Sequence, residues 1–144
     1  MKLHSLKMLS SLVGLALFSG ATFAEGVASP EELASTVKQA IADKDAKAIS
    51  SLYYWEGVTP DFASQLNESF EFMLEEPVRK ADVQPLPDDF YAIQEMDGKS
   101  YSQNLEVVGM IRLVYSLEDD SIIATMPYGT KDDRYYFTAP VVVE

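Results

Sequence analysis

The hydrophobic pattern of this chain changes period once, near Pro77, and that change limits the folds the chain can form. Before Pro77, apolar residues recur at spacings of three and four, as on the buried face of an α-helix. After it, apolar and polar residues alternate, as on a half-buried β-strand. Helices followed by strands predict an α+β fold, with three helices packed on one face of a curved antiparallel sheet of about four strands.

The first half of the chain predicts three helices. Ser29 can cap the first helix by accepting a hydrogen bond from its first turn, the segment Asp43-Lys44-Asp45 can cap the second, and Thr59-Pro60-Asp61 is expected to start the third by the same chemistry. The second helix is expected to end at Gly57 and the third at Pro77. The side chains expected to face the core are Leu33, Val37 and Ile41 in the first helix, Ala48, Ile49, Leu52 and Tyr53 in the second, and Phe62, Leu66, Phe70 and Met73 or Leu74 in the third.

The second half predicts strands. The expected ranges are 78–87, 105–117, 121–127 and 134–143. The first is expected at a sheet edge because prolines limit its pairing. The second is expected to be the longest, with its odd-numbered positions facing the core. Asp97-Gly98 is typical of a hairpin turn, and residues 128–133 are expected to connect the last two strands.

The beginning of the chain has the features of a secretory signal peptide. Lys2 and Lys7 provide the positive charge, Met8–Phe18 is an uncharged apolar run, and small residues precede a cleavage position at Ala24–Glu25. The apolar run is short for a membrane span, which needs about 20 residues. We expect an exported protein, periplasmic or secreted, with residues 1–24 as signal peptide, residues 25–144 as one domain, and no membrane span after cleavage.

The charge of the chain limits its partners. The formal net charge is −12, and cleavage would leave nine basic residues against 23 acidic ones, a net charge of −14. Such a domain repels phosphate backbones and anionic membranes, so neither nucleic acid nor a membrane surface is an expected partner. The acidic surface favours solubility in an exported protein, and the alternative is a cationic partner.

Histidine and cysteine are almost absent. The only His is His4, inside the predicted signal peptide, and there is no Cys. Nucleophilic catalysis of the Ser-His-Asp or Cys-His type therefore has no residues to use, and zinc sites built on His and Cys are excluded in the same way. The acidic clusters do not match the spacing of a calcium loop. We expect no cofactor and no metal, and we assign no catalytic residue.

One local group of residues is suited to binding a ligand. Tyr54, Trp55 and Glu56 lie together, Asp61 follows closely, and Tyr115 falls on the apolar face of the longest predicted strand. A carboxylate among aromatic rings can act as a general base if burial raises its pKa, and a buried tyrosine can donate to an oxyanion. The simpler alternative places the aromatic rings in the core and the carboxylates at solvated helix ends.

Met110 and Arg112 are the candidate interface residues. Both fall on the outward face of the same predicted strand, where a charge among apolar neighbours is unusual. If the outer face of the sheet forms a homodimer, Arg112 would be its polar anchor. The alternative is a cross-strand ion pair with an acidic residue on a neighbouring strand.

The order of these elements resembles the nuclear-transport-factor-2-like superfamily, including its SnoaL-like branch, within the wider cystatin-like group. The features that carry the resemblance are the segment IADKDAKAISSLYYWEGV after the first helix, a third helix before the sheet, and the late segment SIIATMPYGTKDDRYYFTAP. The resemblance implies a curved sheet wrapped around helices, an apolar pocket and dimerisation through the sheet. Because this superfamily includes isomerases, dehydratases, hydrolases and transport adaptors, it implies no single function.

Three functions remain open at this stage. The first is an exported domain that binds a small apolar ligand or a protein partner, as a monomer or homodimer, without catalysis. The second is an isomerase, lyase or hydrolase that uses Glu56 or Asp61 with Tyr115, which requires one of these carboxylates to lie in a pocket. The third is a protein inhibitor or an envelope stress protein whose acidic surface meets a basic partner.

Overall fold

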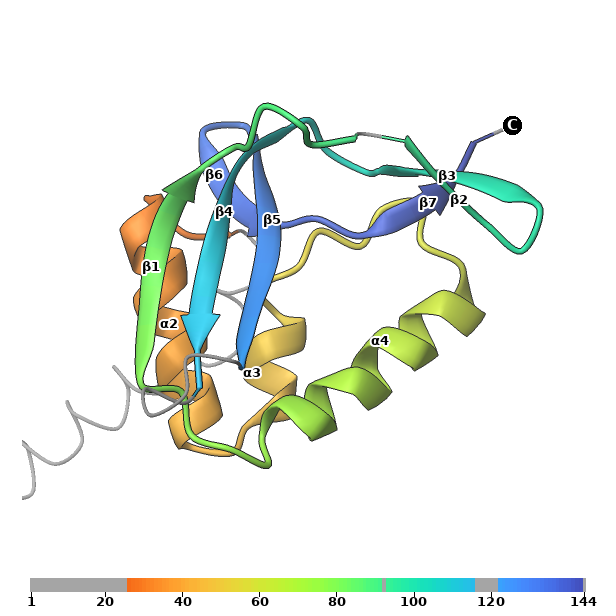
Figure 1. Ribbon diagram of the computed structural model, residues 1–144. Helices are drawn as coiled ribbons and strands as arrows, with labels where there is room; N and C mark the ends of the chain where they lie inside the picture. The colour runs from red at the N-terminus through yellow and green to blue at the C-terminus, as the bar shows by residue number, and fades with distance from the viewer. Residues whose placement is uncertain (1–25, 92, 116–121, 144) are drawn as a thin grey trace, which may run out of the picture.

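The computed structural model describes residues 26–91, 93–115 and 122–143. The predicted signal peptide and the acidic segment 118–120 lie outside the described residues. Within these described residues, three helices precede seven strands (Figure 1). The helices are α2 (Pro30–Ala42), α3 (Ala46–Ser50) and α4 (Pro60–Met73). The strands are β1 (Lys80–Pro85), β2 (Ile93–Met96), β3 (Lys99–Gln103), β4 (Val107–Val114), β5 (Ile123–Lys131), β6 (Arg134–Phe137) and β7 (Pro140–Val142).

Each helix begins at its predicted cap. The side-chain oxygens of Ser29, Asp45 and Thr59 accept hydrogen bonds from the first turns of α2, α3 and α4. These bonds satisfy N–H groups that have no partner within a helix. The sequence therefore determines where the helices start with little help from tertiary contacts.

The predicted end of the second helix was wrong. Helix α3 ends at Ser50 rather than at Gly57. The next residues pair with β6 instead: Phe137 N donates to Leu52 O at 2.9 Å, and Tyr54 N donates to Phe137 O at 2.9 Å. Because these backbone groups bond to a strand, they cannot continue the helix. The third helix also ends before Pro77, at Met73.

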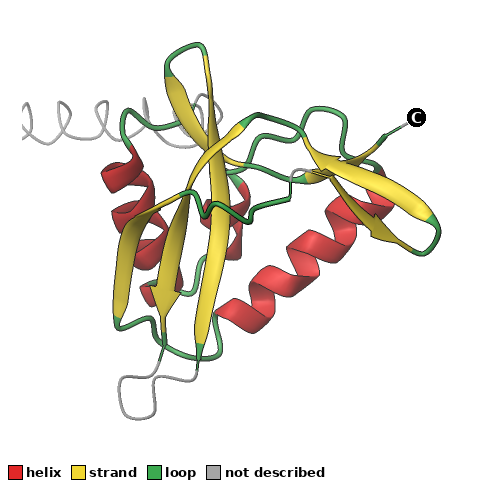
Figure 2. Cartoon of the chain, turned by 45° about the horizontal axis from the view of Figure 1, so that its top comes forward, coloured by secondary structure: helices red, strands yellow, loops and turns green. Residues whose placement is uncertain are grey.

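The strands form two antiparallel sheets. The main sheet has the order β1-β4-β5-β6, and the second sheet has the order β2-β3-β7. The predicted α+β class with a four-stranded sheet is confirmed, and β1 lies at its edge as expected. The hairpin β2–β3 turns at Asp97-Gly98, where both residues have positive φ. Figure 2 shows the two sheets as separate groups of strands, with α4 running beneath the smaller one.

The last two strand boundaries were predicted wrongly. Strand β5 continues through Tyr128 to Lys131, and with nine residues it is longer than β4, which has eight. The turn follows at Asp132 and Asp133, which both have positive φ. The predicted final strand, 134–143, is divided between β6 in the main sheet and β7 in the second, because the chain changes sheets at residues 138–139.

The core lies between the main sheet and helices α2 and α3. Leu33, Val37 and Ile41 of α2 are buried, as are Ile49 and Leu52, which confirms the predicted inner faces of these helices. On β4, the odd-numbered residues Gly109, Ile111 and Leu113 are buried and pack toward the helices. The alternation predicted for this strand therefore sets which face meets the core.

Candidate functional site

In the aromatic segment 53–55, the rings of Tyr53 and Trp55 pack against the core, whereas Tyr54 is not part of it. The ring of Tyr53 packs against Trp55, Phe70 and Phe137, with centroid distances of 5.1 to 5.5 Å. Burial raises the pKa of the Tyr53 hydroxyl well above its ordinary range. Trp55 Nε1 donates to Ser50 O at 2.8 Å, so its polar atom is already bonded within the fold.

The predicted carboxylates lie at the surface. Glu56 and Asp61 are both exposed, and Asp61 is in the first turn of α4. Tyr54 Oη donates to Glu56 Oε1 at 2.5 Å, and this hydrogen bond raises the pKa of Tyr54. A general base tuned by burial needs a desolvated carboxylate. Neither Glu56 nor Asp61 is desolvated. The isomerase, lyase or hydrolase function requires a desolvated carboxylate at one of these positions.

Tyr115 is far from the other predicted site residues. Tyr53 pairs with Phe137, Phe137 with Tyr128, and Tyr128 with Gly109. Tyr115 follows Gly109 by six residues along β4, which corresponds to about 20 Å of extended strand. Burial raises the pKa of the Tyr115 hydroxyl. The fold therefore brings Tyr54, Trp55 and Glu56 together but leaves Tyr115 near the other end of β4.

Asn104 holds this aromatic segment in place. Its Nδ2 donates to Tyr54 O at 2.6 Å and to Glu56 O at 3.2 Å, while its Oδ1 accepts from Ala139 N at 3.0 Å. One side chain therefore joins the segment after α3 to the point where the chain changes sheets. Sequence reasoning missed Asn104, because an Asn between two strands is an ordinary turn residue.

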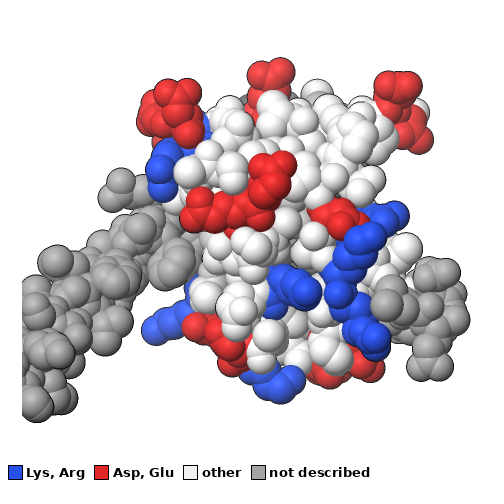
Figure 3. All heavy atoms as spheres, turned by 90° about the vertical axis from the view of Figure 1, so that its left-hand side faces the viewer, with Lys and Arg blue, Asp and Glu red and all other residues white. Residues whose placement is uncertain are grey.

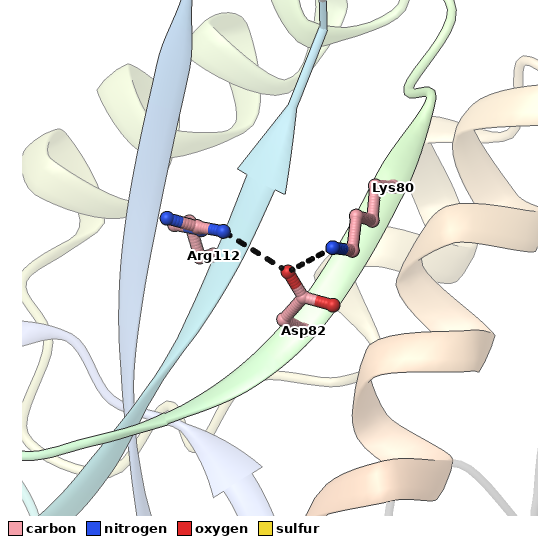
Figure 4. A network of polar contacts seen from close by, with 3 residues as sticks. All are labelled: Lys80, Asp82 and Arg112. Carbon is pink, nitrogen blue, oxygen red and sulfur yellow. Dashed lines mark hydrogen bonds and ion pairs between the residues drawn. The ribbon is translucent and has the colours of Figure 1, made fainter.

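Arg112 takes part in a cross-strand charge network. Its Nη2 lies 3.3 Å from Asp82 Oδ2, and Lys80 Nζ lies 3.6 Å from the same oxygen (Figure 4). Asp82 and Arg112 are directly opposite in the β1–β4 register. This contact is the cross-strand ion pair that was the alternative prediction to a role for Arg112 as the anchor of a homodimer. The Nε of Arg112 is buried with no hydrogen-bond partner among the described residues.

Met110, the other candidate interface residue, is half-buried on β4. It pairs with Gln84 on β1 and with Pro127 on β5. It therefore lies on the same outward face of the sheet as Arg112, two residues away. An interface role for the two residues stays a prediction.

A groove runs between α2 and β1. Its volume is about 440 Å³, and it is lined by Glu31, Ala34, Ser35, Lys38, Arg79, Lys80, Ala81, Asp82 and Val83. We call these residues the α2–β1 groove. The strand side of the lining is formed by five consecutive residues. Successive side chains point to opposite faces of a sheet, so a groove on one face alone would be lined by alternate residues. The groove therefore follows the edge of β1, where the strand's backbone meets it.

The helix side of the α2–β1 groove is one face of α2. Glu31, Ala34, Ser35 and Lys38 follow the spacing of three and four that places residues on one side of a helix. Ala34, Ala81 and Val83 provide small apolar surface, and the other lining residues are polar or charged. The arrangement is an open strand edge beside a helical wall.

A second hollow lies between the loop that follows β1 and the connection from β3 to β4. It has a volume of about 420 Å³ and is lined by Leu86, Phe90, Ser102, Gln103, Asn104, Leu105, Glu106 and Val107. Gln103 Oε1 accepts from Thr138 Oγ1 at 2.6 Å, so that side chain is held within the fold. None of the predicted ligand-binding residues lines this hollow or the α2–β1 groove.

The described residues contain neither a metal-binding cluster nor a membrane-spanning helix. No three His, Cys, Asp or Glu side chains in this part of the chain lie close enough together to hold a metal ion. No helix in the same residues is long and apolar enough to cross a membrane.

Comparisons with known proteins give weak likenesses. A SEC-C motif containing protein from Rhodopseudomonas palustris matches at a TM-score of 0.35 and 16% identity, over 83% of this chain and 82% of that chain. A designed nuclear-transport-factor-2-like protein matches at a TM-score of 0.37 and 8% identity, over 78% and 95%. A calcium/calmodulin dependent protein kinase II association domain from Xanthomonas campestris matches at 0.37 and 16%, over 75% and 79%.

At these TM-scores the likenesses carry no argument about function. No protein-family model and no curated protein matches the chain. The fold class rests instead on the chain's own elements: three helices, a four-stranded antiparallel sheet and a second small sheet. The three helices before a sheet, on which the sequence resemblance depended, are present.

Proposed function

We propose that this protein is an exported binding domain that captures an extended segment of a protein partner along the open edge of β1, in the α2–β1 groove. The observation that carries the proposal is the run of five consecutive strand residues, 79–83, along one side of the groove. An edge strand presents unpaired N–H and C=O groups, and an extended peptide can bond to them as an added strand.

The dimensions of the groove fit a short segment. Residues 79–83 extend over about 13 Å at about 3.3 Å per residue. The wall from Glu31 to Lys38 extends over about 10 Å at about 1.5 Å per residue. The groove therefore accommodates about four residues of extended chain. Backbone bonds to β1 would provide affinity, and side chains that pack on Ala34 and Val83 would provide selectivity.

Strand β2, an edge strand of the second sheet, is less suited to this role. Every residue of β2 is exposed, and the strand has four residues. Strand β2 contributes no residue to the lining of either hollow described above. Very short edge strands are one protection against unwanted pairing. Strand β1 is longer, with six residues, and it has the wall of α2 beside it.

The test is selection from a phage-displayed library of random peptides about 12 residues long, using the purified protein as the target. Ser35→Tyr would fill the α2–β1 groove from an exposed position of α2. Gln39→Tyr, on the same helix and outside the groove lining, is the matched control. We expect selected peptides to bind the wild type and Gln39→Tyr equally and to lose at least about tenfold in affinity for Ser35→Tyr, as expected when a bound side chain loses its space.

Either of two results would overturn the proposal. One is selection that yields no peptide above background. The other is a set of peptides that bind Ser35→Tyr as well as they bind the wild type, which would place the binding surface elsewhere.

A second candidate function is the capture of a small apolar ligand in the hollow between the loop that follows β1 and the β3–β4 connection. The observation that favours it is the apolar part of the lining, which Leu86, Phe90, Leu105 and Val107 provide. Its volume is within the range of small-molecule sites, about 300–1,000 Å³. Native mass spectrometry of the protein from its own host would show a retained small molecule, and Phe90→Ala would reduce its occupancy. A measured mass equal to that of the polypeptide alone would count against this candidate function.

A further inference from the structure

We infer that the segment captured in the α2–β1 groove is acidic, with Asp or Glu side chains that meet Lys38 and Arg79. This inference rests on the proposed function and adds the chemistry of the partner. It reverses the expectation from net charge, under which the acidic surface would meet a basic partner.

The first support is the local balance of charge. Among the residues that the structure describes, 18 acidic side chains stand against nine basic ones. In the lining of the α2–β1 groove the order is reversed, with Lys38, Arg79 and Lys80 against Glu31 and Asp82. Figure 3 views the side that carries α2 and β1, and Lys and Arg side chains gather in its middle and lower parts.

The second support is that one of the two acidic lining residues is already neutralised. Asp82 faces both Arg112, at 3.3 Å, and Lys80, at 3.6 Å. Lys38 and Arg79 form no ion pair with any described residue, and both are exposed. An acidic segment would therefore find two uncommitted cations, one on each wall of the groove, against one remaining carboxylate, that of Glu31.

Charge also decides between an acidic segment and a second copy of this chain. A homodimer that paired β1 with β1 would bring two cation-rich edges together, and like charges across paired strands are destabilising. An acidic segment has the opposite sign to the groove. The charge of the rest of the molecule opposes a short segment only weakly, because exposed charges beyond about 8 Å are largely screened in physiological salt.

A long polyanion is a poorer fit than a short acidic segment. Nucleic acid would extend beyond the groove over the surrounding acidic surface, and its affinity depends on many phosphate contacts. The groove provides two uncommitted cations and a strand edge, which match the side chains and the backbone of a short peptide.

The test is to sequence those peptides, selected on the wild-type protein by phage display, that no longer bind the Ser35→Tyr variant. We expect Asp and Glu to be enriched about threefold over the starting library in this set. The variant Lys38→Glu/Arg79→Glu should bind these peptides about tenfold more weakly, which is the effect of two exposed ion pairs. The control Lys47→Glu/Lys99→Glu has the same net charge and changes two exposed cations outside the groove, so its affinity should stay within about twofold of the wild type.

The outcomes separate the inference from the proposed function. Peptides that depend on the groove but show no enrichment of Asp and Glu, and that bind Lys38→Glu/Arg79→Glu unchanged, would overturn the acidic segment and leave strand capture intact. The absence of any groove-dependent peptide would overturn strand capture itself. A dimer seen by native mass spectrometry that Ser35→Tyr dissociates would identify a second copy as the occupant and contradict the inference.

Discussion

The two sheets of this protein are held in different ways. The main sheet contributes Ile111, Leu113, Met126 and Phe137 to a buried core that α2 and α3 cover. In the second sheet, no residue of β2, β3 or β7 is buried. The main sheet is therefore stabilised by hydrophobic packing, whereas the second is held by its own backbone bonds and by partly exposed contacts to the rest of the chain, such as that of Tyr101 with Phe62. The comparison shows that one domain of this size need not extend its core under every strand.

Helix α4 belongs to the weakly packed half. Within it, Phe70 is buried, while Phe72 is 68% exposed and Phe62, Leu66 and Met73 are half-buried. The ring of Phe62 contacts Tyr101 of β3 at a centroid distance of 6.0 Å. Helix α4 thus contacts both halves of the molecule, the core through Phe70 and the second sheet through Phe62.

The largest effect that we expect comes from the core. Phe137→Ala removes a ring that is 0% exposed and contacts Tyr53. It should lower the free energy of unfolding by about 3–5 kcal/mol. Tyr101→Ala in the second sheet should cost about 1 kcal/mol, because its ring is half-buried against Phe62. Urea denaturation of both variants measures the difference, and equal losses would remove the distinction between the two halves.

The next effect concerns the connection between the halves. Asn104→Ala removes the side chain that bonds to Tyr54 O, Glu56 O and Ala139 N. The loss should be about 1–3 kcal/mol, because the partly buried C=O of Tyr54 and N–H of Ala139 would lose their partners. The control is Asn67→Ala, whose Nδ2 donates to Ala63 O on the exposed side of α4; it should change stability by less than about 0.5 kcal/mol. Similar losses in the two variants would show that Asn104 is an ordinary surface residue.

A third effect appears at alkaline pH. Burial raises the pKa of Tyr53 in the folded state above the value near 10 of an unfolded chain. As the pH rises above about 10, the Tyr53 hydroxyl loses its proton in the unfolded state before it does so in the folded state. This ionisation favours the unfolded state, so the free energy of unfolding is unaffected below about pH 10 and decreases above it. The slope for one such tyrosine approaches about 1.4 kcal/mol per pH unit.

Tyr53→Phe should flatten this alkaline decline while keeping the ring contacts with Trp55 and Phe70. Chemical denaturation at several pH values between about 8 and 11 measures it, across the ordinary tyrosine pKa. An unchanged slope in Tyr53→Phe would mean that Tyr53 is more open to solvent than its pKa shift implies.

The smallest effect concerns the charge network on β1. Asp82→Asn removes the carboxylate shared by Lys80 and Arg112, and should cost about 1 kcal/mol or less, because the pairs are partly exposed. Lys80→Ala should cost less than Asp82→Asn, since the Lys80 side chain is 59% exposed. Thermal denaturation of both variants in low and high salt ranks them. A larger loss for Lys80→Ala would contradict the network as described.

Sequence reasoning succeeded where local chemistry decides the structure. The caps Ser29, Asp45 and Thr59, the turn at Asp97-Gly98 and the buried positions of β4 follow from neighbouring residues alone. Sequence reasoning failed where pairing with a strand distant in the sequence determines the local structure. The residues after Ser50 pair with β6 instead of extending α3, and β5 continues past Pro127 because β6 and β4 pair with its next residues.

The candidate site was predictable only in part. Tyr54, Trp55 and Glu56 are adjacent in the chain, so their proximity needed no fold, but Tyr115 was assigned to them from its strand face without its position along the strand. The α2–β1 groove joins residues 31–38 to residues 79–83. No local pattern connects these two ranges, because the contact arises from the packing of a helix beside a sheet edge.

Strand capture along β1 can be measured by hydrogen exchange of the protein, alone and with a peptide selected for dependence on the α2–β1 groove. We expect the peptide to slow exchange of backbone amides within 79–83 of β1 and to leave the amides of β2 and β3 unchanged. Slower exchange in β2 or in residues 86–90, with no change in β1, would contradict strand capture along β1 and place recognition on the weakly packed half of the molecule.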